Sequence, residues 1–250
     1  MDFGFDVISE EEYQRQHALY GPLTEALRKL IAAGIHTEVD EDTVRNAQSA
    51  IEAATEMLER KQRTVTSTLR HEGTGRPLAW ANPAVGLRNA IAPPMIIHHE
   101  ADGRAWSDFT LSGAYEGPPG WVHGGICALV LDHILGEAAS NGLTQPKFTG
   151  TISLRYLRGT PLGLLRAEAY IDRTEGVKTF ARGYLSDAEG TTVEAEGVFI
   201  RPAWARDAGR SSMSAPRFWT PARSSKSPRP PMISATTGWA SPITSSTSRR

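Results

Sequence analysis

One apolar segment of the sequence carries polar residue types whose positions could serve chemistry. In GPPGWVHGGICALVLDHILG, residues 117–136, the tripeptide His123-Gly124-Gly125 opens a nearly unbroken apolar run that contains Asp132. An ionised carboxylate in a low-dielectric setting is costly unless it is paired or hydrogen-bonded. Asp132 is therefore either a structural residue, satisfied by a salt bridge or at an interface, or a group kept for use in the protein's chemistry.

The turn before this run has the features of a carbonyl-binding site. The first amides of a helix have no partner within it, and the positive end of the helix dipole favours an oxygen that develops negative charge. Gly124 and Gly125 would let a substrate carbonyl approach closely, although glycines at a helix start often only make a turn. We expect His123 to orient this turn by hydrogen bonding rather than to act as a general base.

Other catalytic and metal-binding patterns are weak or missing from the sequence. His98 and His99 are neighbours on a predicted strand, so they point to opposite faces and do not chelate one metal together. No G-x-S-x-G elbow, P-loop or dinucleotide fingerprint occurs. Cys127 is the single cysteine, so it forms no intrachain disulfide, and packing is its expected use. We expect no metal and no cofactor.

Composition and charge point away from nucleic acid and from the membrane. The formal net charge of the 250 residues is -1, and no apolar stretch reaches the roughly 20 residues of a membrane-spanning helix. The acidic start MDFGFDVISEEEYQRQ does not resemble a signal peptide. These features predict a soluble cytoplasmic protein with no nucleic-acid partner and no membrane span.

The elements around the apolar run predict an α+β domain. The run itself is apolar nearly all round, which predicts a buried helix beginning near Gly124. Alternating or β-rich segments predict two strands before it, within 94–102 and 104–115, and four strands after it, within 149–157, 164–172, 177–187 and 191–200. RTEG and DAEG would join the last three strands as hairpins. The pattern favours a mostly antiparallel sheet wrapped around one helix, within residues 94–205.

The flanking regions have different compositions. Residues 22–35 and 41–61 predict amphipathic helices in an N-terminal extension over 1–65, the second capped by Asp40. Residues 62–93 hold several Gly and Pro, so we interpret 66–93 as a linker. The segment 206–250 has eight Lys or Arg against one acid and no apolar periodicity, which predicts a disordered basic tail.

Three segments in this order resemble a known family. YEGPPGWVHGGICALVLDHILG, TGTISLRYLRGTPLG and TEGVKTFARGYL are similar to the hotdog-fold thioesterase superfamily, in its PaaI-like branch with the THEM-type acyl-CoA thioesterases. The resemblance covers about residues 90–202. It implies hydrolysis of an acyl-CoA to a free acid and CoA. Gly159 departs from the usual Y-L-R-P, and Gly117 replaces a side chain that some relatives carry before the turn.

The resemblance also implies roles for single residues. Asp132 matches the nucleophile or the base for water, Gly124 the amide that polarises the thioester carbonyl, and Thr149 a hydroxyl that positions the water. The resemblance gives Gly125, the second glycine of the turn, a substrate-binding role. It also implies that three residues line the CoA-binding surface: Arg155, Tyr156 and Lys178.

Helix geometry adds an expectation about assembly. Gly124 and Asp132 are eight residues apart, which is about 12 Å along a helix, so both cannot touch one carbonyl group. We expect a homodimer, or a dimer of dimers, in which each site joins Asp132 and Thr149 of one chain to Gly124 of the other. The alternative is a catalytically silent acyl-CoA-binding or regulatory hotdog protein; a dehydratase is disfavoured because its usual histidine block is not found.

Overall fold

The centre of the protein is a six-stranded sheet, seen in a computed structural model that describes residues 5–62 and 68–207. The strand order is β4-β5-β7-β8-β9-β6, and every neighbouring pair is antiparallel. This arrangement confirms the predicted α+β class. The strands are β4 (His98–His99), β5 (Ala105–Leu111), β6 (Phe148–Tyr156), β7 (Gly163–Glu175), β8 (Lys178–Asp187) and β9 (Gly190–Ile200).

Two tight turns make β7, β8 and β9 a continuous meander. Gly176 and Gly190 have φ values of 57° and 120°, a backbone region that favours glycine, and they lie at the ends of the predicted RTEG and DAEG turns. At the closed end of the first hairpin Glu175 pairs with Lys178, and at the closed end of the second Asp187 pairs with Gly190. Both hairpins are therefore where the sequence predicts them.

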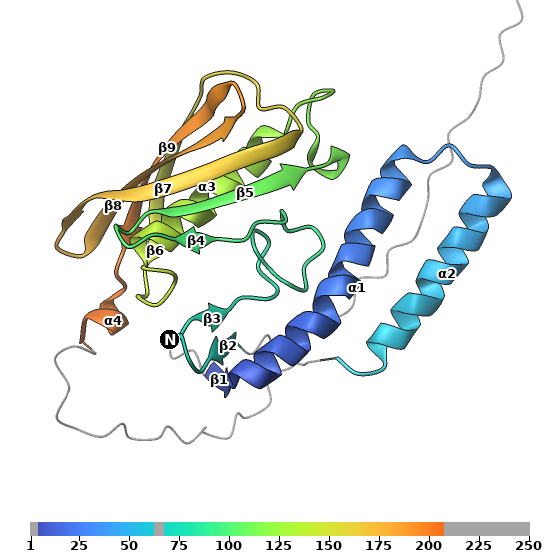
Figure 1. Ribbon diagram of the computed structural model, residues 1–250, viewed down its shortest axis with the longest axis horizontal. Coiled ribbons are helices and arrows are strands. Elements are labelled where there is room, and N and C mark those ends of the chain that lie inside the picture. Colours follow the sequence, from blue (N-terminus) through green and yellow to red (C-terminus); the bar gives the residue numbers. More distant parts are fainter. Residues whose placement is uncertain (1–4, 63–67, 208–250) are drawn as a thin grey trace, which may run out of the picture. The chain divides into compact units, whose positions relative to one another are not determined.

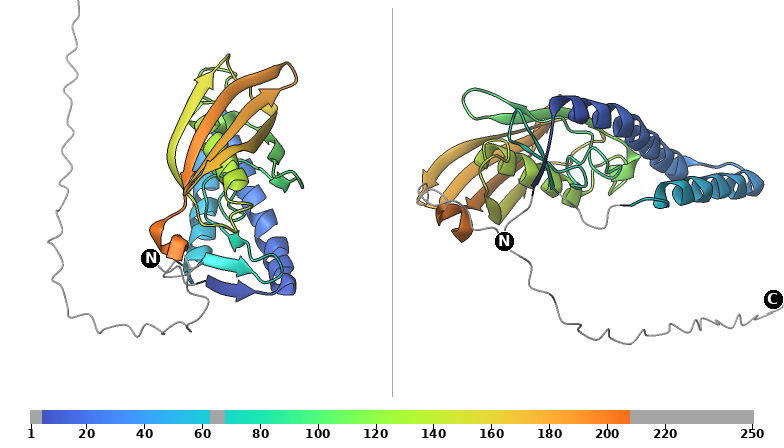
Figure 2. Two further views of the ribbon diagram at one scale, coloured as in Figure 1. Left: turned by 90° about the vertical axis from the view of Figure 1, so that its left-hand side faces the viewer. Right: turned by 90° about the horizontal axis from the view of Figure 1, so that it is seen from below.

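The helix α3 (Gly124–Ala139) lies against one face of this sheet (Figures 1 and 2). Its buried side chains pack on alanines and larger apolar residues that point inward from β5, β7, β8 and β9. Alternation along the strands produces this one-sided core, because successive side chains point to opposite faces. The fully buried members include Val130, Leu131, Ile134, Leu135, Leu165, Leu185, Val193 and Phe199.

The first helix is longer than its sequence pattern predicts. The helix α1 spans Glu10–His36, whereas we expected it to begin near Pro22, a residue that suits a first helical position. Ser9 caps the true start by accepting a hydrogen bond from the Glu12 amide at 3.2 Å, and three glutamates follow it. Pro22 lies inside the helix, where burial of the flanking Gln16 and Thr24 holds both halves against the rest of the chain.

A small second sheet occupies part of the predicted linker. The strands β1 (Phe5–Ile8), β2 (Thr68–His71) and β3 (Pro77–Leu78) form it in that order, with β1 and β2 parallel. The interpretation of 66–93 as a linker is therefore corrected for Thr68–His71 and Pro77–Leu78, which are strands. The reason is long-range pairing with residues 5–8, which no local pattern reveals. Conversely, the sequence predicts a strand within 94–102, but only His98–His99, the strand β4, is extended and paired there.

The remaining helices lie outside the main core. The helix α2 spans Glu41–Glu59, and Asp40 caps it through the Thr43 amide at 2.9 Å, as predicted. A short helix, α4 (Ala203–Asp207), includes the first two residues of the predicted tail; the rest of that tail, 208–250, lies outside the described residues. Within the described ranges, no helix combines the length and apolar character needed to cross a membrane.

Candidate active site

The turn before α3 is held in place by hydrogen bonds from His123. The His123 amide donates to the Tyr115 carbonyl at 2.9 Å, and its Nδ1 accepts from the Gly125 amide at 3.0 Å. The His123 carbonyl accepts from the Ile126 amide at 2.9 Å. His123 is thus the N-cap of α3, and its Nδ1 is engaged by the backbone rather than free to act as a base.

The Gly124 amide is left available at the start of the helix. Gly124 is the first residue of α3, and among the described residues no group accepts a hydrogen bond from its N–H. Its carbonyl accepts from the Tyr156 hydroxyl at 2.8 Å, which ties this first turn to β6. A helix start with a free amide can stabilise an oxygen that gains negative charge.

Two glycines that differ from the family pattern fit tight contacts beside this turn. A Cβ at Gly117 would lie 2.9 Å from the His123 Cα, closer than real Cβ atoms approach backbone. A Cβ at Gly159 would lie 2.5 Å from the Trp121 ring. Both positions therefore need glycine, because the 117–123 turn folds directly onto them.

Asp132 and Thr149 form the second part of the site. The Thr149 hydroxyl donates to Oδ1 of Asp132 at 2.9 Å. Asp132 is half-buried on α3, and a register shift between Thr149 and Thr151 in the β6–β9 pairing marks a local irregularity of β6 at this point. The pair leaves the second carboxylate oxygen, Oδ2, free of any hydrogen bond from the described residues.

The strand β6 therefore braces both parts of the site. Thr149, near its start, contacts Asp132, and Tyr156, at its end, contacts Gly124. Along the helix, the two parts stay about 12 Å apart, since eight residues separate them. We refer to the Gly124 turn and the Asp132–Thr149 pair as half-sites, because within one chain they are too far apart to contact one carbonyl group together.

Two of the expected substrate-binding cations lie on the other face of the sheet. Arg155 is exposed and pairs with Glu194 of β9, with its Nε 3.2 Å from the Glu194 carboxylate. Lys178 is exposed at the first position of β8. Because successive strand residues alternate, Arg155 points away from the face on which Tyr156 reaches Gly124. Arg155 and Tyr156 are neighbours in sequence, but the structure does not bring their side chains to the same site.

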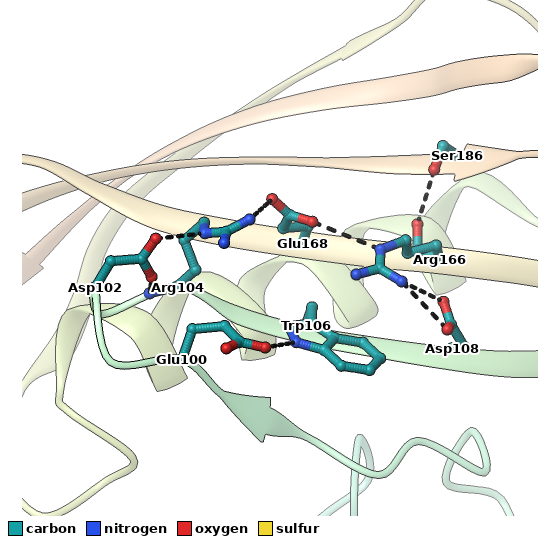
Figure 3. Close-up of polar contacts among 8 residues, drawn as sticks. All are labelled: Glu100, Asp102, Arg104, Trp106, Asp108, Arg166, Glu168 and Ser186. Carbon is teal, nitrogen blue, oxygen red and sulfur yellow. Dashed lines mark hydrogen bonds and ion pairs between the residues drawn. The ribbon is translucent and has the colours of Figure 1, made fainter.

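Ion pairs cover the outer face of β5 and β7 (Figure 3). Glu168 lies 3.5 Å from both Arg104 and Arg166, and Arg166 also contacts Asp108 at 3.2 Å. The Arg166 guanidinium lies over the ring of Trp106, with its Cζ 4.3 Å from the ring centre. These cations already have carboxylate partners, which is typical of a structural network.

Sequence reasoning missed a buried carboxylate on α3. Glu137 is 2% exposed and is contacted by Arg76 at 3.0 Å, His99 at 3.2 Å and His133 at 3.4 Å. Burial alone would raise its pKa, but contacts with both histidines and the charge of Arg76 outweigh this and lower the pKa to about 2. The i, i+4 spacing of His133 and Glu137 was the available signal.

Glu137 also lines a cavity of about 650 Å³ on that flank of the helix. The cavity lies between α1, residues 71–97 and α3, and its walls include Trp80, Met95 and Leu143. None of Gly124, Asp132 and Thr149 lines it. The half-sites therefore do not open into this cavity.

Comparisons with known proteins agree with this architecture. The thioesterase superfamily model matches residues 119–194, which contain both half-sites. A crystal structure of a thioesterase superfamily protein aligns with 31% sequence identity and a TM-score of 0.65, over 72% of this chain and 94% of its own length. The chain has the hotdog fold, a sheet wrapped around a central helix. It belongs to the thioesterase superfamily.

Two more distant structures also match. One is a putative thioesterase from Ralstonia eutropha, related to phenylacetic acid degradation, with 24% identity over 42% of this chain and 83% of its own, and a TM-score of 0.40. The other is the E. coli PaaI protein from the phenylacetic acid degradation operon, with 16% identity over 44% and 80%, and a TM-score of 0.41.

Proposed function

We propose that the protein is an acyl-CoA thioesterase that hydrolyses the thioester to a free acid and CoA. The observation that carries the proposal is the 2.9 Å hydrogen bond from Thr149 to Asp132 on the helix whose first amide, that of Gly124, is free. Membership of the thioesterase superfamily supports thioester hydrolysis as the class of reaction.

In this mechanism the two half-sites divide the work. The Gly124 amide and the helix dipole polarise the thioester carbonyl and stabilise the oxyanion. Thr149 holds one oxygen of Asp132, so the other oxygen attacks the carbonyl carbon or takes a proton from water that attacks it. The C–S bond then breaks and CoA leaves as the thiolate. Where Asp132 acts as base, the proton that it took from water goes to this thiolate and the free acid is formed directly. Where Asp132 attacks, the acyl group remains on its carboxylate as a mixed anhydride, which water hydrolyses to the free acid, and a proton released by that water neutralises the thiolate. Gly125 and Tyr156, beside the Gly124 turn, would contribute to binding the substrate, whereas Arg155 and Lys178 lie on the other face of the sheet and would not reach a carbonyl group held at this turn.

A complete site would need two chains. The half-sites are about 12 Å apart on one helix, and β6 is an edge strand of the sheet with exposed Phe148 and Tyr156. An edge strand presents unpaired backbone groups that a second copy can pair with. We therefore propose that Gly124 of one copy faces Asp132 and Thr149 of the other, in a homodimer or a dimer of dimers.

Free thiol release from a panel of acyl-CoA chain lengths tests the proposal. Asp132→Asn, which is nearly isosteric, should abolish turnover, and Thr149→Ala should lower kcat by about tenfold or more, since a hydrogen bond to a charged group contributes about 1.5–3 kcal/mol. Thr149→Ser should retain most activity, and Thr151→Ala, at an exposed position of the same strand, is the matched control.

A binding measurement with acyl-CoA, run beside the thiol assay, tests the alternative that the protein is a silent acyl-CoA-binding protein. Binding of acyl-CoA by wild type and by Asp132→Asn, with no thiol release by either, would favour that alternative. Wild-type rates in Asp132→Asn would refute the assigned role of the aspartate.

A further inference from the structure

The helix α2 carries an apolar stripe that nothing in the described chain covers. All 19 residues of Glu41–Glu59 are exposed, including Val44, Ile51 and Leu58, whose side chains are 46%, 42% and 52% exposed. These three residues are seven apart and so lie along one face of the helix. Ala47 and Ala54 fall on the same face.

A solvated helix of this kind needs a partner to be stable. Most helical stability in proteins comes from packing an amphipathic face, because isolated helices of this length are marginal in water. The Asp40 cap and the Glu41–Arg45 ion pair stabilise α2 only locally. The stripe is therefore the surface through which α2 would gain its stability.

The stripe is symmetric about its own centre. Val44 and Leu58 lie at equal distances in sequence from Ile51, one on each side. In an antiparallel pair of identical helices with Ile51 on the two-fold axis, Val44 of each copy faces Leu58 of the other. Ala47 and Ala54 lie between these contacts, four residues before and three residues after Ile51. The two alanines leave room for the backbones to approach.

The charges at the two ends match the same arrangement. Glu41 and Asp42 are in the first turn of α2, and Arg60 and Lys61 directly follow its last turn. Antiparallel pairing places each acidic start beside a basic end, whereas parallel pairing would place like charges together. An anionic membrane surface is disfavoured as the partner, because α2 carries five acidic residues and one arginine.

We propose that two copies of this chain pair through α2, antiparallel and centred on Ile51. This contact is separate from the half-sites of α3 and β6, and it does not depend on the reaction that they catalyse. In an assembly that also pairs through β6, it would be an additional contact between copies.

Single cysteines and a short bismaleimide crosslinker test the geometry in dilute solution. Ile51→Cys should crosslink into a dimer, because the two-fold axis brings both copies of residue 51 together. Val44→Cys should not, since its two copies would be about 21 Å apart. The double variant Val44→Cys/Leu58→Cys should crosslink. The native Cys127 is buried, so the wild type is the background control.

Ser49→Cys, on the opposite face of the same helix, is the matched control. A yield from Ile51→Cys no higher than that from Ser49→Cys would overturn the proposal, as would equal crosslinking of Val44→Cys. Circular dichroism of each variant verifies that the helix content is unchanged. Asp132→Asn in the Ile51→Cys background should crosslink equally well, which separates failure of this contact from failure of the proposed reaction.

Discussion

At the scale of single residues, the two carboxylates of α3 have opposite surroundings. Asp132 is half-buried, with one hydroxyl partner and one free oxygen, which suits a group that reacts. Glu137, five residues later, is fully enclosed and contacts an arginine and two histidines. We therefore assign Glu137 to the stability of the fold: it ties α3 to Arg76, which precedes β3, and to His99 of β4.

The lowered pKa of Glu137 predicts a pH-dependent contribution to stability. Folding lowers the pKa of Glu137 from 4.5 to about 2. The ionised Glu137 therefore contributes its full share of the folding stability at pH values above 4.5, the pKa of the unfolded chain. This contribution is lost as the pH falls from 4.5 towards 2. A shift of this size corresponds to about 3 kcal/mol. Glu137→Gln should therefore lower the free energy of unfolding by about that amount at pH 7.

Urea unfolding of both proteins at pH 7 and at pH 3 checks this prediction. The difference between wild type and Glu137→Gln should shrink at the lower pH. Glu194→Gln, which removes the exposed partner of Arg155, is the control and should cost less than about 1 kcal/mol. A difference for Glu137→Gln that is the same at both pH values would contradict the assignment.

At the scale of elements, what the sequence predicts depends on how local the cause is. The hairpin turns, the start of α2 at Asp40 and the buried run of α3 follow from patterns within a few residues, and all are present. The parallel pairing of β1 with β2 joins residues about 60 apart, so no local pattern announces it. Pro22 suggested a helix start, but packing of α1 on the rest of the chain decides its length.

The same distinction applies to the site. Asp132 is visible in the sequence because an acid in an apolar run is unusual, and the His123-Gly124-Gly125 turn is visible because it stands directly before that run. The contact between Tyr156 and Gly124 was not visible, because it depends on which face of β6 is turned to the helix. The network around Glu137 was missed for the same reason, since Arg76 and His99 come from distant segments.

The start of α3 offers a way to remove one amide and little else. Gly124→Pro deletes the N–H at the first helical position, where proline is well tolerated, and His123 has the extended conformation, φ −60° and ψ 131°, that a residue before proline adopts. We expect kcat for thiol release to fall by about 100-fold, the loss typical of one oxyanion donor.

Gly124→Ala is the control, since it keeps the amide and its Cβ would meet the Tyr156 hydroxyl at an ordinary 3.5 Å. Circular dichroism and the urea midpoint should be close to wild type for both variants. If Gly124→Pro hydrolysed acyl-CoA as fast as Gly124→Ala, the Gly124 amide would not be the oxyanion donor.

At the scale of the whole molecule, the arrangement of the half-sites makes a quantitative prediction about mixed assemblies. Asp132→Asn and Gly124→Pro damage different halves of the site. If each site takes Asp132 from one copy and Gly124 from the other, a dimer of the two variants has one site with both changes and one site with neither. Random mixing makes half of the dimers mixed, so activity should recover to about a quarter of the wild-type value.

Denaturing the two inactive variants together, refolding them and assaying thiol release measures this recovery. Each variant refolded alone gives the baseline, and wild type carried through the same steps gives the reference. Recovery should rise and then fall as the mixing ratio passes through one to one, because mixed dimers are most abundant there. A site built within one chain would show no recovery at any ratio, since every chain would carry a damaged site; that result would exclude the shared site while leaving acyl-CoA hydrolysis by the wild type intact.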